Sequence, residues 1–168
     1  MLLHAVAAIL TRDLHALRRE VETYPDEAQL WLRPPGIPNS AGTLALHLAG
    51  NLQHYVGAVL GGTGYVRDRP AEFASRVPRG VILREIEAAL EAVGAALGQT
   101  PESAIKDDFP EPIGEIRVEL GEYLVHLVSH FTYHLGQLDY HRRVVTGQSS
   151  GLNLVRPAEL ASARPIGS

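Results

Sequence analysis

The 168-residue sequence contains no cysteine. This absence excludes disulfide bonds, thiolate ligands to a metal ion and a cysteine nucleophile. A metal ion bound to this chain must therefore be held by histidine, aspartate or glutamate side chains, or by water. The phosphate-binding P-loop and the GxGxxG motif of dinucleotide-binding folds are also absent, so nucleotide chemistry built on those loops is not expected.

The chain has no excess of positive charge and no long apolar run. It contains 15 Lys and Arg residues against 19 Asp and Glu, which gives a formal net charge of −4. This balance provides no general attraction to nucleic acid or to an anionic membrane. No segment approaches the roughly 18 apolar residues of a membrane span, and the N-terminal stretch lacks the charged start of a signal peptide. We predict a soluble cytoplasmic protein with no nucleic-acid or membrane partner.

Apolar residues recur at helical spacing in four segments. The predicted helices cover residues 2–23, 40–60, 80–98 and 119–146. The connections contain proline and glycine, and the one between the second and third helices is long. An all-α fold follows, a four-helix bundle for which the sequence leaves both a simple antiparallel and a crossover topology open. We expect one domain over 1–168, with a core at about 2–146 and an irregular tail at 147–168 that holds at most a short turn at 157–163.

Half of the eight histidines lie in one stretch, HLVSHFTYHLGQLDYHRR at 126–143. At 100° per residue they occupy one arc of the predicted helix, beside its apolar stripe. These four residues are His126, His130, His134 and His141. The second predicted helix repeats the arrangement with His47, Asn51 and His54. Because the two helices should pack together, their polar stripes are expected to converge on one pocket.

The spacing of these histidines suits a metal ion. Residues four apart on a helix project side by side, so two imidazoles can bind one ion at about 2.0–2.1 Å. A third histidine from a neighbouring helix leaves positions open for water or substrate, as in catalytic centres. Spacing alone does not choose between His126–His130 and His130–His134, and helical histidines are often ordinary surface residues. The isolated His4 and His15 are expected at the surface, and His141 at the bundle end or the surface.

Two segments resemble the DinB/YfiT-like metalloenzyme superfamily, LALHLAGNLQHYVG at 44–57 and HFTYHLGQ at 130–137. The loop LGGTGYVRDRPAEF resembles a subgroup of the same superfamily. Its members are four-helix bundles that hold a metal with one histidine of the second helix and an HxxxH pair of the last long helix. The resemblance implies His47, His130 and His134 as ligands of a divalent ion. Zinc, nickel, iron and manganese all accept imidazole ligands, so the ligand set does not identify the metal.

Four polar residues are expected near the implied ligands. Asn51 follows His47 by one turn and either hydrogen-bonds a ligand or metal-bound water, or caps loop backbone. His54 and His126 become neighbours of the site that touch a ligand or face the substrate. Gln137 is an ordinary surface residue by spacing, whereas the motif favours a structural or pocket role.

The loop after the second helix carries two arginines with two interpretations. Arg67 and Arg69, with Asp68 and Glu72, form an ion network that anchors the loop; this is the preferred interpretation. The alternative is a guanidinium that faces the pocket and holds an anionic substrate. Tyr123 is a further substrate-facing candidate, although such aromatic residues more often belong to a core or a pocket rim.

The resemblance also implies a function. Relatives in the superfamily include thiol-dependent S-transferases and isomerases, in which a metal activates a low-molecular-weight thiol for attack on a small electrophile. The competing hypothesis is a non-catalytic metal- or small-ligand-binding module of a stress response, or a dimeric scaffold. A deep pocket with open metal positions favours the enzyme, and a site saturated by protein ligands favours the module. No catalytic side chain is assigned, and a homodimer formed through the first or third helix is expected.

Overall fold

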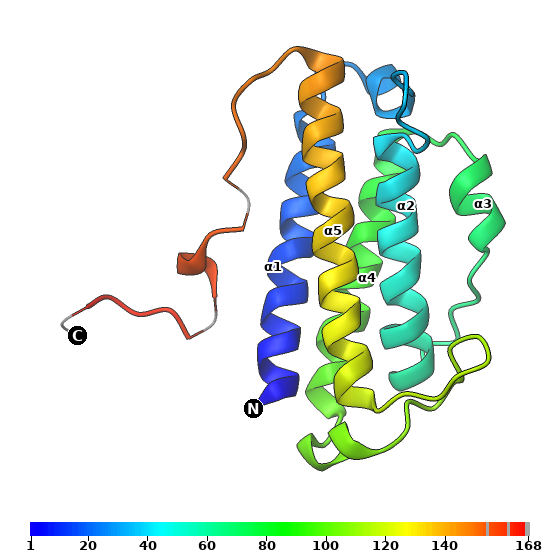
Figure 1. The fold of residues 1–168 in the computed structure, drawn as a ribbon, viewed down its shortest axis with the longest axis vertical. Coiled ribbons are helices and arrows are strands. Elements are labelled where there is room, and N and C mark those ends of the chain that lie inside the picture. Colours follow the sequence, from blue (N-terminus) through cyan, green and yellow to red (C-terminus); the bar gives the residue numbers. More distant parts are fainter. Residues whose placement is uncertain (154, 161, 167–168) are drawn as a thin grey trace.

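The computed structural model describes residues 1–153, 155–160 and 162–166. Its long helices are α1 (Leu2–Thr23), α2 (Ala41–Leu52), α4 (Arg79–Gln99) and α5 (Leu120–Thr146), and α2 continues as a π-helix over Gln53–Leu60. They lie side by side as a bundle, with no β-strand among the residues described (Figure 1). The predicted all-α four-helix bundle is confirmed.

Shorter elements complete the fold. A helix α3 (Arg69–Ala74) lies outside α2, and 3-10 turns cover Glu27–Trp31, Glu102–Lys106 and Pro157–Glu159. Isolated antiparallel bridges join Asp108 to Glu119 and Ile113 to Ile116, so the segment before α5 contains a small extended turn. The expected turn at 157–163 is present in its first part, and residue 161 lies outside the described residues.

The bundle has a crossover topology. Gln53 Nε2 donates to the Glu85 carbonyl at 3.3 Å, and a Cβ on Gly61 would lie 2.9 Å from Ala96 Cβ, so α2 with its π-helical extension runs parallel to α4. Arg142 near the C-terminal end of α5 pairs with Glu20 near the C-terminal end of α1, so these two helices also run parallel to each other. The connection over residues 61–78 therefore returns along the bundle and carries α3 past α2 (Figure 1).

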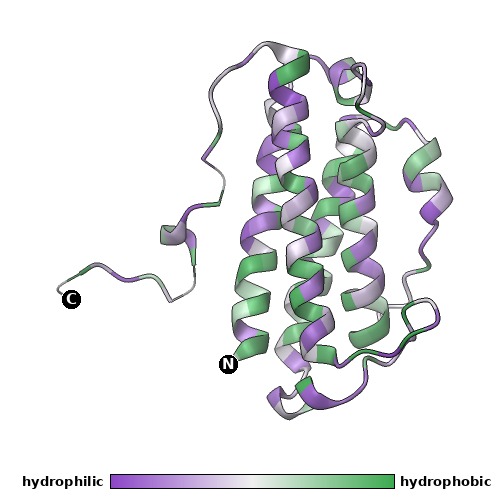
Figure 2. Cartoon of the chain, viewed as in Figure 1, coloured by the Kyte–Doolittle hydropathy of each residue, from purple (hydrophilic) through white to green (hydrophobic). Residues whose placement is uncertain are grey.

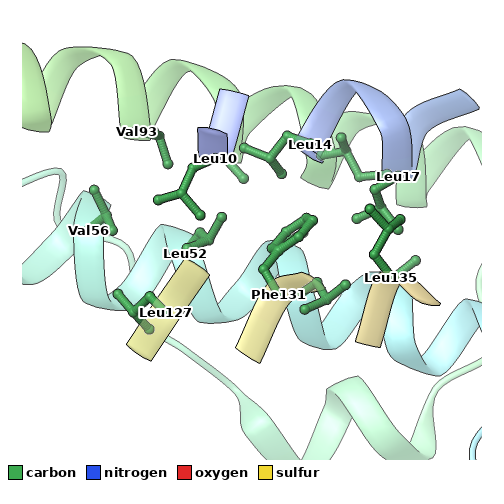
Figure 3. Close-up of a cluster of buried hydrophobic side chains, with 14 of the residues drawn as sticks. Leu10, Leu14, Leu17, Leu52, Val56, Val93, Leu127, Phe131 and Leu135 are labelled. Carbon is green, nitrogen blue, oxygen red and sulfur yellow. The ribbon is translucent and has the colours of Figure 1, made fainter. Parts of the chain in front are cut away.

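Each long helix is amphipathic and turns its apolar side to a shared core. Figure 2 shows hydrophobic and hydrophilic residues on every long helix. The core side chains shown in Figure 3 come from all four helices and include Leu10, Leu14, Leu17, Leu52, Val56, Val93, Leu127, Phe131 and Leu135. Burial of a side chain of this size stabilises the fold by about 1.5–3 kcal/mol.

The π-helix changes which residues of the second helix are buried. A continuous α-helix would place Tyr55 and Val59 in the core stripe with Leu48 and Leu52. In the structure Val56 is fully buried, and Tyr55 and Val59 are only partly buried. Hydrogen bonds in a π-helix span five residues, as from Gly61 N–H to the Val56 carbonyl at 3.0 Å, so the faces rotate relative to α-helical spacing.

His141 is buried at the end of the bundle and is not a surface residue. Its Nε2–H donates to the Leu32 carbonyl at 2.8 Å, and its Nδ1 accepts from the Tyr24 hydroxyl at 2.9 Å. Burial lowers its pKa, so the ring stays neutral. His141 therefore joins α5 to the segment after α1, while His4 and His15 are exposed as expected.

Close packing at the start of α2 predicts a large effect of one methyl group. Ser40 caps this helix by accepting from Thr43 N–H at 3.2 Å, and a Cβ on Gly42 would lie 2.7 Å from the buried Trp31 ring. We expect Gly42→Ala to lower the free energy of unfolding by about 1–3 kcal/mol because the ring must move. The matched control is Gly94→Ala on α4, where no described atom beyond the adjacent residues and the backbone of the same helix lies within 4 Å of the added Cβ.

The control should raise the free energy of unfolding by about 1 kcal/mol, since alanine is the better helix former. Urea denaturation of the two variants measures both changes. Equal shifts in the two variants would contradict the packing assigned to Gly42.

Candidate metal centre

Three histidines from two helices lie together where α2 faces α5. His47 comes from α2, and His130 and His134 come from consecutive turns of α5. The ring centroids lie 5.2 Å apart for His47 and His130, 5.4 Å for His47 and His134, and 4.7 Å for His130 and His134. One nitrogen of each ring lies within 4.8 Å of the other two. This geometry is suited to a single metal ion.

The nitrogen atoms that face one another fit a divalent cation. His47 Nε2 and His130 Nε2 are 3.3 Å apart. Two nitrogens bound at about 2.0–2.1 Å to one tetrahedral ion are separated by roughly 3.3–3.4 Å. The Nδ1 atoms of His47 and His134 have partners within the protein, which leaves their Nε2 atoms for a metal. The three residues thus supply three nitrogens and leave a tetrahedral ion one further position.

Glu72 and Arg67 orient the His47 ring. The Nδ1–H of His47 donates to Glu72 Oε2 at 2.9 Å, and Arg67 donates to both carboxylate oxygens at 2.6 and 2.9 Å. Burial by itself would raise the pKa of Glu72, but the hydrogen bonds from His47 and Arg67 outweigh it and lower the pKa. The ionised carboxylate fixes the tautomer in which Nε2 of His47 carries a lone pair, as carboxylates behind metal ligands do.

Of the predicted ion network of Arg67, Asp68, Arg69 and Glu72, the described residues contain the Arg67–Glu72 pair, while Asp68 caps a helix and Arg69 lies over the Phe73 ring. The sequence does not predict the contact of this pair with His47. Within the long connection after the second helix, α3 begins at Arg69 and carries Glu72 to the site. Asp68 caps this helix by accepting from Ala71 N–H at 3.0 Å, and Pro70 lies in its first turn. An acidic cap followed by proline is a recognised signal for a helix start. A Cβ on Gly50 would lie 2.5 Å from Glu72 Oε1, so a glycine at this position of α2 makes room for the carboxylate.

Removing the charge of Glu72 should weaken metal binding without removing a ligand. For Glu72→Gln we expect metal affinity to fall about 10–100-fold, as for other residues that orient a ligand imidazole. Competition with a chromogenic zinc chelator measures this change. The matched control is Glu111→Gln, because Glu111 also accepts from a histidine, His54, at 3.2 Å. Affinities that agree between the two variants would show that Glu72 does not support the site.

His130 and His134 are held in the neutral form that binds metals. Burial is the largest cause that lowers the pKa of His130, to about 4. Electrostatic repulsion between a protonated His130 and the imidazoles of His134 and His47 lowers it in the same direction. Burial also lowers the pKa of His134, although its hydrogen bond to Gln137 opposes the shift. The Nδ1–H of His134 donates to Gln137 Oε1 at 2.7 Å, so Gln137 orients this ring from the helix surface.

His130 is oriented by ring packing. Within the described parts of the chain, its buried Nδ1 has no hydrogen-bond partner. Its ring instead stacks on the His126 ring, with 6.2 Å between the ring centroids and 25° between the ring planes. The His126 ring stacks in turn on the Tyr123 ring, with 5.8 Å between the centroids and 14° between the planes. His126 therefore contacts one of the three converging histidines.

The three histidines open into a cavity of about 540 Å³. The other side chains of its wall that the sequence indicates are Asn51, Arg67, Arg69, Tyr123 and His126. Burial and the nearby Tyr55 raise the pKa of Tyr123, which keeps its hydroxyl protonated. Arg69 lies 5.3 Å from the centroid of the Phe73 ring. The cavity thus combines two guanidinium groups, an amide and a neutral hydroxyl around the histidines.

His54 is not part of this wall. Its Nε2 lies 3.2 Å from Glu111 Oε1 in a hydrogen bond, and its ring centroid lies 4.7 Å from that of Tyr55. The π-helix starts at Gln53, so His54 no longer follows His47 and Asn51 at α-helical spacing.

A comparison with protein families identifies the family to which the chain belongs. The family model described as mycothiol-S-transferase matches residues 5–147. The chain belongs to the mycothiol-S-transferase family. This family is part of the DinB/YfiT-like metalloenzyme superfamily, so the resemblance seen in the sequence is confirmed. No curated protein and no solved structure shows a match to the chain. In the residues that the structure describes, no helix is long and apolar enough to cross a membrane.

Proposed function

We propose that this member of the mycothiol-S-transferase family is a metal-dependent thiol S-transferase, with a divalent ion held by His47, His130 and His134. The observation that carries the proposal is the convergence of three imidazole nitrogens in the wall of an open cavity. A divalent cation bound there would lower the pKa of a thiol at its open position. Family membership supports a low-molecular-weight thiol of the mycothiol class as the donor.

The side chains around the histidines divide the remaining tasks. Glu72 and Gln137 hold the rings of His47 and His134 in place. Arg67 is held by Glu72, whereas Arg69, Asn51 and Tyr123 face the cavity and are proposed to hydrogen-bond the polar groups of the thiol. No side chain beyond the three histidines is assigned to the chemical step.

The reaction is a nucleophilic displacement. The thiol loses its proton to solvent, and its sulfur donates an electron pair to an electrophilic carbon of a small substrate. The carbon–sulfur bond forms as the bond between that carbon and its leaving group breaks, and the leaving group departs with the electron pair. The open cavity supports this assignment, because a purely structural site is closed by protein ligands.

The test is transfer to a fluorogenic haloalkyl electrophile, such as monochlorobimane, in the presence of mycothiol. We expect turnover with untagged protein loaded with zinc, nickel, iron or manganese, and loss of turnover after chelation. No metal-dependent acceleration with any of these ions would overturn the transferase. Homodimerisation and a cytoplasmic location stay predictions, and sedimentation velocity tests the first.

A further inference from the structure

A second cavity, of about 350 Å³, adjoins the metal cavity. The two share Asn39 and Leu44 in their walls. Gln137 lines the second cavity and accepts the hydrogen bond from His134, so one side chain contacts both the second cavity and a proposed metal ligand. A molecule in this cavity would therefore lie next to the residue that orients His134 and next to the wall of the metal cavity.

The wall of the second cavity is mainly apolar. Ile37, Pro38, Leu44, Tyr140 and Val144 contribute most of it. Two of its polar members are already engaged. Both nitrogens of His141 have partners, and the side-chain oxygen of Gln137 is bonded to His134. The cavity thus offers mostly carbon to a ligand, unlike the metal cavity with its arginines and histidines.

The apolar side chains at its mouth are exposed to water. The exposed fractions are 40% for Ile37, 67% for Tyr140 and 62% for Val144. Neighbouring exposed apolar residues around a hollow are typical of a ligand-binding groove. Because this groove shares Asn39 and Leu44 with the wall of the metal cavity, a small molecule that reaches the metal centre is the occupant that best accounts for it.

We propose that the second cavity binds the apolar part of the electrophile, the second substrate of the transfer. This assignment rests on the proposed function, since a transferase must bring two substrates to one reacting centre. The polar metal cavity takes the thiol, and the apolar cavity takes a small alkyl or aryl group. The enzyme should therefore favour electrophiles with longer apolar chains.

The first experiment measures binding without catalysis. Metal-loaded protein is titrated with inert primary alcohols from propanol to hexanol, and the methyl NMR signals of Ile37, Leu44 and Val144 are followed. Each added methylene should tighten binding by about fourfold if it enters an apolar site. Val144→Arg should abolish this dependence. The matched control is Val125→Arg, also exposed on α5 and outside the wall of either cavity, which should leave it unchanged.

The second experiment uses turnover of a 1-bromoalkane series with the thiol. Val144→Arg should raise KM for the longer bromoalkanes at least 10-fold and leave KM for the thiol and the metal content unchanged.

The outcomes separate the two proposals. If the alcohols bind as expected but the wild type transfers no thiol, the proposed function is overturned and the second cavity is only an apolar binding site. Transfer with the same KM in the two arginine variants would overturn the second cavity as the electrophile site. The electrophile site is also overturned if sedimentation shows that Val144→Arg separates a dimer of the wild type, because a second copy would then cover the groove.

Discussion

His130→Ala is expected to yield a folded protein that no longer retains stoichiometric metal. His130 Nε2 lies 3.3 Å from His47 Nε2, and its ring lies between His126 and His134 on α5. Its removal leaves two imidazoles, and a divalent ion held by two neutral ligands dissociates readily. Residues that only orient a ligand change metal affinity about 10–100-fold, so loss of a ligand should cost more than about 100-fold.

Metal content of untagged protein, measured by mass spectrometry after gel filtration, checks this expectation. The matched control is His15→Ala, which removes an exposed histidine from α1 and should keep the full metal content. Alanine is a good helix former, so neither variant should lose helical circular dichroism. Equal metal content in the two variants would contradict the assignment of His130.

Arg142→Met is expected to have the largest effect on stability. The Arg142 side chain is fully buried, and its Nε donates to the equally buried Glu20 at 2.6 Å. It also donates to Asp139 at 2.8 Å and to Gln148 at 2.8 Å. The substitution leaves the carboxyl group of Glu20 buried without a cation. Breaking such a pair on one side costs about 3–5 kcal/mol of the free energy of unfolding.

The loss of stability in Arg142→Met should depend on pH. Burial raises the pKa of Glu20 to about 7 even with Arg142 beside it, and removal of the guanidinium raises it further. A carboxyl group with a folded-state pKa above its unfolded value binds its proton more tightly when folded, so stability falls as pH rises through that interval. The variant should therefore be less destabilised at pH 5 than at pH 8.

Urea denaturation at the two pH values measures the effect. The matched control is Arg143→Ala, whose guanidinium is partly exposed and pairs with Asp139 at 2.6 Å. This partly exposed pair should contribute no more than about 1 kcal/mol. Similar losses for Arg142→Met and Arg143→Ala would contradict the role given to the buried pair.

The bundle is predictable because its helices carry regular apolar patterns. The ends of the long helices at Thr23, Leu60 and Thr146 agree with the predicted ends. The crossover topology is not predictable in this way, since apolar periodicity gives the faces of helices and not their directions. The sequence does not decide between two placements of His141, because its position depends on Tyr24 and Leu32, which are 117 and 109 residues away along the chain.

The candidate site is only partly predictable from the sequence. Spacing on one helix leaves His126–His130 and His130–His134 equivalent, and only the motif around His130 favours the second pair. The structure brings His47, His130 and His134 together, as the resemblance implies. The contact of Glu72 with His47 does not follow from a loop of irregular structure, and it requires α3, whose Asp68 cap is a signal present in the sequence. The displacement of His54 depends on a π-helix, which has no recognised sequence pattern here.

The most direct test of the central claim is anomalous scattering from a crystal of the untagged protein. Data collected on both sides of the absorption edge of the metal identify the ion and its ligands together. We predict one strong peak bounded by the Nε2 atoms of His47, His130 and His134, with at least one position open to the cavity. A metal bound elsewhere, or no peak among these three histidines in protein supplied with each candidate ion, would contradict it.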